Sequence, residues 1–122
     1  MEAFKTDLNY RVLTIFAPVL ILAGVLGFVL PDGPMSSAPA YNIFHIVFGA
    51  LGGVLVLVRR MHSIRTFNLA FGLIDLYQAL ASFLGLFPQE YFRWKTADDV
   101  LHVVIGAALV AVGLAGRRDW RG

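Results

Sequence analysis

Two histidines lie inside strongly apolar stretches of this chain, where ionisable side chains are costly and are therefore candidates for function. Each is followed four residues later by a glycine, so that His45 precedes Gly49 and His102 precedes Gly106. Imidazole pairs ligate haem and chlorophyll-type pigments, bind metals, move protons or form hydrogen bonds between helices. The glycines leave room either for a flat macrocycle or for a neighbouring helix.

Other polar residues accompany this pair. Asn42 and Asp99 each lie three residues before one of the histidines. Asp99 is placed to orient the His102 ring or to cap the start of its helix. In a third apolar stretch, Asp75 and Gln78 lie three residues apart and share one helix face.

Four apolar segments must position these residues. The chain has 122 residues, of which 58% are hydrophobic and 15% charged, and each apolar block approaches the ~20 residues that cross a bilayer as a helix. We therefore predict an all-α membrane protein, a single transmembrane domain over 1–122 folded as a four-helix bundle. The predicted helices cover about 12–30, 39–58, 66–87 and 97–116.

An internal repeat organises these helices. At an offset of 57, Asn42 to Ala50 aligns with Asp99 to Ala107, which brings the His and Gly of each segment into one register. The pattern predicts two tandem helical hairpins, related as a parallel repeat by an axis along the membrane normal. The two histidines then lie at equal depth. Counting along the helices puts Gln78 near their level and Asp75 about a turn deeper, near the two glycines.

Positive charge indicates the orientation of the helices. Most of the ten Lys and Arg residues fall on one side of the predicted helices. These residues are Lys5, Arg11, Arg59, Arg60, Arg65, Arg117, Arg118 and Arg121. The asymmetry predicts that both termini are cytosolic, and it explains these charges without nucleic acid as a partner. Tyr10 and Trp120 on this side, and Tyr91, Phe92 and Trp94 on the other, are expected to anchor the bundle at the membrane interfaces.

The motifs resemble those of a bacterial family of four-helix membrane proteins catalogued as a domain of unknown function. They comprise Gly27-Phe28 near the end of the first helix, Asn42-x-x-His45-x-x-x-Gly49, and Asp98-Asp99-x-x-His102. The resemblance covers nearly the whole chain. It implies a four-helix fold and a bacterial cytoplasmic or photosynthetic membrane, and it implies no activity.

The sequence allows three interpretations of the histidines. They form structural hydrogen bonds with Asn42, Asp99 or Gln78; they are axial ligands of haem or (bacterio)chlorophyll; or, with Asp99, they bind a metal or move protons. The chain has no cysteine and no evident nucleophile–base pair, so we expect no enzyme. The favoured prediction is an accessory or stabilising subunit of a respiratory or photosynthetic membrane complex. It would contact lipid and either membrane-protein partners or further copies of itself. The alternatives are a pigment or haem protein using His45 and His102, and an oligomeric proton or ion conductor using Asp75.

Overall fold

The structure is a computed structural model that describes residues 7–115. Its helices, in chain order, are α2 (Leu8–Val29), α3 (Pro39–Leu57), α4 (Met61–Leu84), the short α5 (Gln89–Phe92) and α6 (Thr96–Ala115). No strand occurs within the described range. This described part of the chain is therefore all-helical, as the apolar blocks predict.

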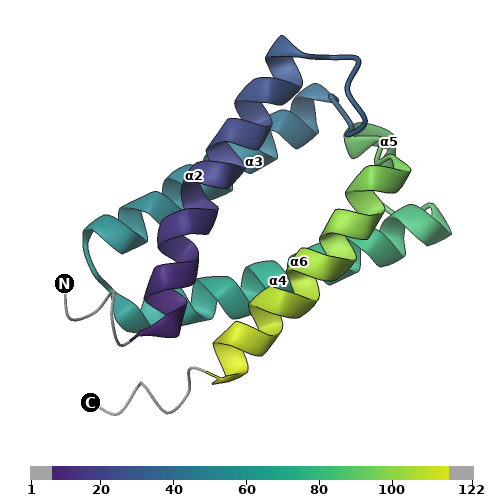
Figure 1. The fold of residues 1–122 in the computed structure, drawn as a ribbon. Helices are drawn as coiled ribbons and strands as arrows, with labels where there is room; N and C mark the ends of the chain where they lie inside the picture. The colour runs from purple at the N-terminus through teal and green to yellow at the C-terminus, as the bar shows by residue number, and fades with distance from the viewer. Residues whose placement is uncertain (1–6, 116–122) are drawn as a thin grey trace.

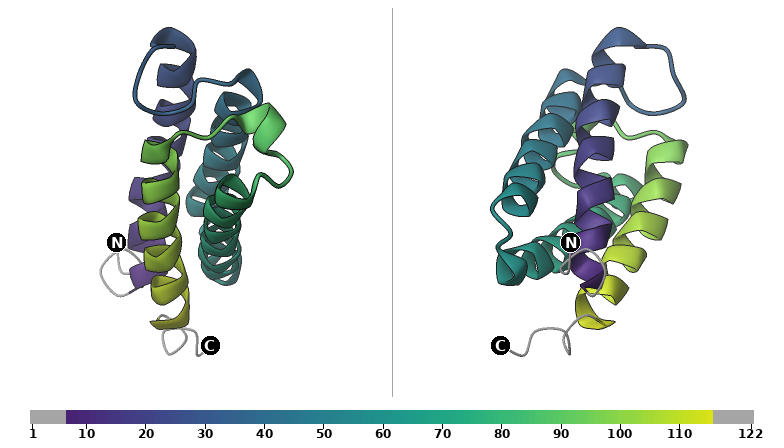
Figure 2. Two further views of the ribbon diagram at one scale, coloured as in Figure 1. Left: turned by 90° about the vertical axis from the view of Figure 1, so that its right-hand side faces the viewer. Right: turned by 60° about the vertical axis from the view of Figure 1, so that its left-hand side comes forward.

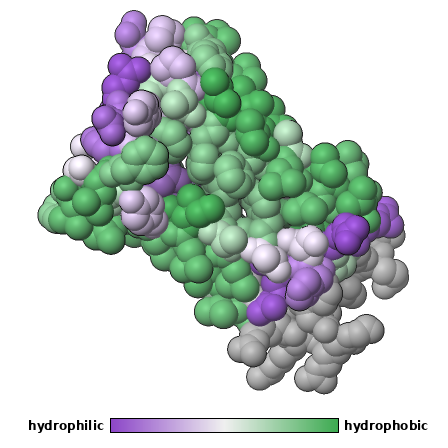
Figure 3. Space-filling view, turned by 180° about the vertical axis from the view of Figure 1, so that it is seen from behind, coloured by the Kyte–Doolittle hydropathy of each residue, from purple (hydrophilic) through white to green (hydrophobic). Residues whose placement is uncertain are grey.

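Four of these helices are long and apolar enough to cross a membrane, namely α2, α3, α4 and α6. A space-filling view shows an apolar band across the molecule between polar patches at two ends (Figure 3). Large apolar side chains point outward from all four helices; Leu57 and Phe83 are 82% and 86% exposed. Such outward faces suit lipid or another membrane protein, because a helix in water would carry polar residues there.

The four helices form two hairpins, α2 with α3 and α4 with α6, and each pair packs closely (Figures 1 and 2). Glycines allow this approach. A Cβ on Gly49 would lie 2.8 Å from the backbone nitrogen of Ile21 on α2. A Cβ on Gly106 would lie 2.9 Å from the carbonyl oxygen of Gly72 on α4. Small residues permit such close packing where no hydrophobic effect drives helices together.

The boundaries of the first and third long helices differ from the predicted ones. The first helix begins at Leu8, ahead of the predicted start at 12, because the Asp7 carboxylate accepts a hydrogen bond from the Tyr10 amide at 3.0 Å. The third begins at Met61 and ends at Leu84, where Gly85 adopts a left-handed conformation with φ 70°. The apolar blocks therefore predicted the apolar parts of these helices and missed their starts.

At one end of the bundle, the start of α2, the turn between α3 and α4 and the end of α6 come together (Figure 1). Asn68 Nδ2 donates to Asn9 Oδ1 at 3.0 Å, and the Arg65 guanidinium donates to the Gly113 carbonyl at 2.8 Å. We call this the α3–α4 end. Lys5, Arg117, Arg118, Trp120 and Arg121, which the charge and anchor predictions used, lie outside the described residues, as does Gly116 at the end of the last predicted helix.

At the opposite end, which we call the α5 end, the loop between α2 and α3 lies against the segment around α5 and the start of α6. Ser36 Oγ donates to the Phe92 carbonyl, and the Ser36 amide donates to the Asp98 carboxylate at 2.8 Å. The two hairpins are thus joined by hydrogen bonds at both ends. The candidate site lies at this α5 end.

Candidate functional site

Asp98 is the centre of a buried hydrogen-bond cluster at the α5 end. Its side chain is fully buried and lies in the first turn of α6. One carboxylate oxygen, Oδ2, accepts from the amides of Ser36 and Lys95, both at 2.8 Å. The Lys95 bond is the reciprocal half of a capping box, in which the third helical residue bonds the amide before the helix. The Asp98 side chain therefore caps the start of α6 and also holds the α2–α3 loop in place.

Tyr41 connects Asp98 to a histidine. Its hydroxyl lies 3.0 Å from Asp98 Oδ1 and 2.8 Å from His102 Nε2, and its ring is only 1% exposed. Tyr41 has one hydroxyl proton and donates it to the carboxylate, so a neutral His102 must donate from Nε2. This fixes the His102 tautomer and leaves its Nδ1 unprotonated. That nitrogen is buried and has no hydrogen-bond partner among the described residues.

The same tyrosine packs against the second histidine. The Tyr41 and His45 rings are 4.3 Å apart between centroids and meet edge to face, one turn apart on α3. His45 is 7% exposed, and its Nδ1 has no partner of good geometry in the described chain, although the Tyr41 backbone lies near the ring. The two histidines are thus brought to one place, with Tyr41 in contact with both.

A second series of hydrogen bonds connects the segment after α5 to two residues of α4. Trp94 Nε1 donates to Gln78 Oε1 at 3.0 Å, and Gln78 Nε2 donates to Asp75 Oδ1 at 3.2 Å. All three side chains are buried; Asp75 is 3% exposed. Asp75 lies against Gly106, as the helix count predicts. No hydrogen bond joins Asp75 to either histidine in residues 7–115.

Asn42 and Asp99 have lesser parts than the sequence analysis gave them. Asn42 donates to the Ser37 carbonyl at 3.1 Å and packs against Gly27, whose added Cβ would overlap the amide. Asp99 Oδ1 is buried without a hydrogen-bond partner in the described residues. The carboxylate that positions His102, through Tyr41, is Asp98 and not Asp99.

A cofactor held between the two histidines does not fit this geometry. The Tyr41 hydroxyl is hydrogen-bonded to Nε2 of His102, so this nitrogen would be free to hold a cofactor only if that bond were broken. Gly49 and Gly106 lie against helices of their own hairpins, so neither leaves space for a macrocycle. Within residues 7–115, no three His, Asp or Glu side chains are grouped so as to hold a metal ion. We therefore derive no haem, pigment or metal chemistry from this pair.

Four residues of the site had no predicted role in it, although Asp98 belongs to one of the motifs quoted from the sequence. Tyr41 and Asp98 each lie four residues before a histidine, a spacing that puts them on the same helix face as that histidine. Ser36 belongs to a loop, which no helical pattern reaches. Trp94 was expected at the membrane interface, but it is 6% exposed and turned inward to Gln78.

Comparison with known proteins identifies no relative: no family model, no curated protein and no solved structure matches the chain. The chemical capacity of the site follows from its bonds alone. Asp98, Tyr41 and His102 are joined by hydrogen bonds, and so are Trp94, Gln78 and Asp75, which makes both sets cross-links between segments.

Proposed function

We propose that this protein is a non-enzymatic, multi-pass membrane protein that serves as an accessory or stabilising subunit of a larger membrane complex. The proposal rests on where polar and apolar side chains lie: the polar ones bond inside the bundle and the apolar ones face outward. Asp98, Tyr41 and Gln78 are bonded within the chain, while the outward faces of the four long helices are apolar (Figure 3). A scaffold needs this division, whereas a catalyst needs polar groups that reach a substrate.

One outward glycine favours a protein partner over lipid alone. A Cβ on Gly53 of α3 would meet nothing within 4 Å, unlike one on Gly49 or Gly52 of the same helix. Ala50 and Val54 beside it are exposed. In a membrane, a bare outward glycine lets the backbone of another helix approach closely. This part of α3 is therefore the face that we assign to a partner.

The proposal includes a bacterial membrane, with both termini in the cytosol. The asymmetric distribution of Lys and Arg supports this orientation. The absence of cysteine makes it testable, because Asp32→Cys and Ser63→Cys each introduce a single thiol at opposite ends of the bundle. A membrane-impermeant maleimide should label position 32 in intact cells and position 63 only after lysis. The reverse pattern would invert the proposed orientation.

The repeat and the family resemblance also remain part of the proposal. Tyr41 and Asp98 lie 57 positions apart, which is the repeat offset, and they bond to each other. Corresponding residues of two hairpins meet in this way when they lie beside an axis along the membrane normal. The bond therefore supports two tandem hairpins related as a parallel repeat.

The test of the function is extraction of the native membrane in a mild detergent, followed by size-exclusion chromatography and mass spectrometry of the tagged chain. We expect the protein in a particle much larger than the monomer, with other subunits in fixed ratio. Their identity decides between respiratory and photosynthetic complexes. Elution of all the protein as a monomer, at several detergent concentrations and after chemical cross-linking, would overturn the proposal.

A further inference from the structure

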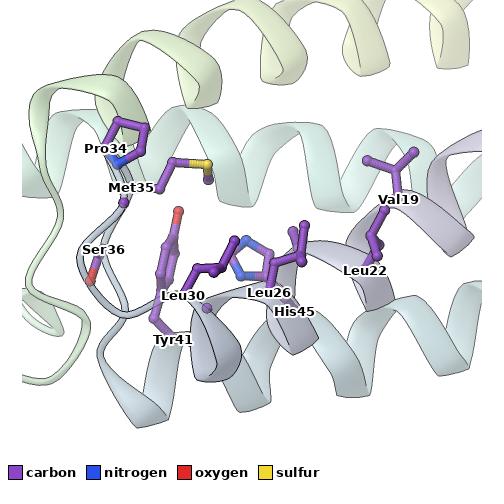
Figure 4. A pocket seen from close by; sticks show the side chains of 12 residues that line it. Val19, Leu22, Leu26, Leu30, Pro34, Met35, Ser36, Tyr41 and His45 are labelled. Carbon is purple, nitrogen blue, oxygen red and sulfur yellow. The ribbon is translucent and has the colours of Figure 1, made fainter.

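An apolar groove of about 320 Å³ lies beside α2 at the α5 end of the bundle (Figure 4). Its wall is formed by one face of α2, by the loop that follows α2, and by two side chains of α3, Tyr41 and His45. The residues on α2 and at its C-cap are Val19, Leu22, Ala23, Leu26, Gly27 and Leu30. The groove is lined almost entirely by carbon, apart from these α3 side chains and Ser36.

The shape of the groove suits an extended hydrocarbon chain. Val19 and Leu30 mark its two ends on α2, and a rise of ~1.5 Å per residue separates them by about 16 Å. The volume of about 320 Å³ over that length gives a mean cross-section of about 20 Å². That is about the cross-section of one hydrocarbon chain. Because Leu30 lies near the end of α2 and Val19 near its middle, the groove runs from the membrane surface toward the bilayer centre.

His45 gives the groove a polar point part-way along. Figure 4 shows its ring among the lining side chains, near Leu26. The residue is more than nine-tenths buried, at 7% exposure, and its Nδ1 has no partner of good geometry in the described chain. The other ring nitrogen, Nε2, is not among the fully buried atoms, so in the tautomer that carries its proton there it can donate a hydrogen bond to an acceptor in the groove. His45 is also six residues into α3, about 9 Å below the start of that helix.

A cation lies at the mouth of the groove. The Lys95 ammonium donates to the carbonyl of Gly33 at 3.1 Å, and Gly33 is one of the lining residues. Lys95 is exposed and keeps further donors for a ligand. Asp32, the neighbour of Gly33, is also exposed and moderates this charge. Cations at this level of a bilayer attract anionic lipid headgroups.

We propose that the groove binds one anionic glycerophospholipid. Its phosphate lies at Lys95, an ester carbonyl accepts from the His45 ring, and one acyl chain lies along α2 toward Val19. The order of these three features along α2 is the order of headgroup, ester and chain in one leaflet. The site goes beyond the role as a subunit, since it needs no protein partner and only requires that the helices span a membrane.

The binding test uses purified, delipidated protein in detergent, with native mass spectrometry to count bound lipids during titration. Three probes share the same chain length: phosphatidylglycerol, phosphatidylcholine and a diether phosphatidylglycerol that lacks ester carbonyls. We expect one phosphatidylglycerol per protein, bound about fivefold more tightly than phosphatidylcholine because of the single lysine. The diether analogue should also bind about fivefold more weakly, since it loses one hydrogen bond.

Matched variants locate the site. Leu26→Trp fills the groove and should weaken binding of phosphatidylglycerol at least tenfold, whereas Leu51→Trp, on the outward face of α3 and 47% exposed, should not change it. Lys95→Gln should remove the preference for phosphatidylglycerol over phosphatidylcholine. In His45→Phe, the ester and diether lipids should bind equally. The diether comparison in the wild-type protein tests the histidine without altering the fold.

The outcomes are decisive in both directions. Equal binding of all three lipids to the wild-type protein, many lipids bound without saturation, or unchanged binding to Leu26→Trp would overturn the proposed site. Because the assay uses the isolated protein, its failure does not affect the proposed role as a subunit. Conversely, if the natively extracted protein elutes only as a monomer while the purified protein binds one phosphatidylglycerol, this inference stands and the proposed role as a subunit is overturned.

Discussion

The hydroxyl of Tyr41 lies 2.8 Å from Nε2 of His102, although the two residues are 61 positions apart and belong to different hairpins. The same hydroxyl lies 3.0 Å from Asp98, which also holds the α2–α3 loop and the start of α6. One phenol group therefore bridges the hairpins, the loop and a helix start. Buried groups that are bonded in this way are costly to leave unpaired, and the first predictions follow from that cost.

Tyr41→Phe should destabilise the bundle by about 1–3 kcal/mol, because it leaves both Asp98 Oδ1 and His102 Nε2 without a partner. The measurement is thermal or denaturant unfolding in detergent, followed by circular dichroism. Tyr91→Phe is the matched control, since Tyr91 is 56% exposed. Equal stability of the two variants would show that the bridge contributes nothing.

Asp98→Asn should loosen the α2–α3 loop. The carboxylate accepts three hydrogen bonds, and an amide presents one acceptor oxygen and a donor group to the same donors. Amide exchange in peptides covering 31–38 should therefore become faster by hydrogen-exchange mass spectrometry. Asp99→Asn serves as the control because Asp99 Oδ1 has no partner in the described structure. If Asp99→Asn had the larger effect, Asp98 would not be the centre of the cluster.

The sequence predicted the helices from its long apolar segments, because such segments are long enough to cross a bilayer only as helices with internally bonded backbones. It also indicated that the two histidines lie at the same end of the bundle, because they occupy corresponding positions in two similar sequence segments. The repeat offset of 57 also aligns Tyr41 with Asp98, which are hydrogen-bonded to each other. Because a tyrosine and an aspartate are chemically different, comparison of the two segments did not identify them as related positions. Bonding between corresponding positions requires complementary groups, not identical ones.

The remaining differences arise in the connecting segments. The inward position of Trp94 depends on how the α5 segment folds back over α4, and hydropathy predicts only that an indole prefers an interface. The role of Ser36 depends likewise on a loop whose path is set by Asp98. Both residues are positioned by tertiary contacts, which no local pattern encodes.

Asp75 should act as a structural acceptor, not as a proton carrier. The groups between it and the α5 end are the Gln78 amide and the Trp94 indole, neither of which exchanges a proton readily at neutral pH. Asp75→Asn keeps an acceptor for Gln78 and should alter stability little, whereas Asp75→Ala should cost about 1–3 kcal/mol. In liposomes loaded with a pH-sensitive dye, both variants and the wild type should show no proton flux. Wild-type proton flux that disappears in Asp75→Asn would instead support the conduction alternative.

Gly106→Ala should be strongly destabilising because the added methyl would lie 2.9 Å from the carbonyl oxygen of Gly72, a backbone atom that cannot move aside alone. Overpacking of this kind costs about 1–3 kcal/mol. Gly53→Ala is the control, since its methyl would meet nothing within 4 Å. The fraction of each variant that survives heating as a monodisperse species gives the comparison. Equal survival would mean that α4 and α6 do not cross as closely as described.

Gly53→Leu should separate assembly from folding. A leucine at this outward position has open space within the chain and should leave the unfolding midpoint of the isolated protein unchanged. It would, however, prevent another helix from approaching α3 closely. We therefore expect the native particle to lose its partner subunits or to dissociate at lower detergent concentration. The matched substitution Ala111→Leu, at an exposed position on α6, should leave the particle intact. If both variants assemble as the wild type does, α3 faces lipid and the partner surface lies on another helix.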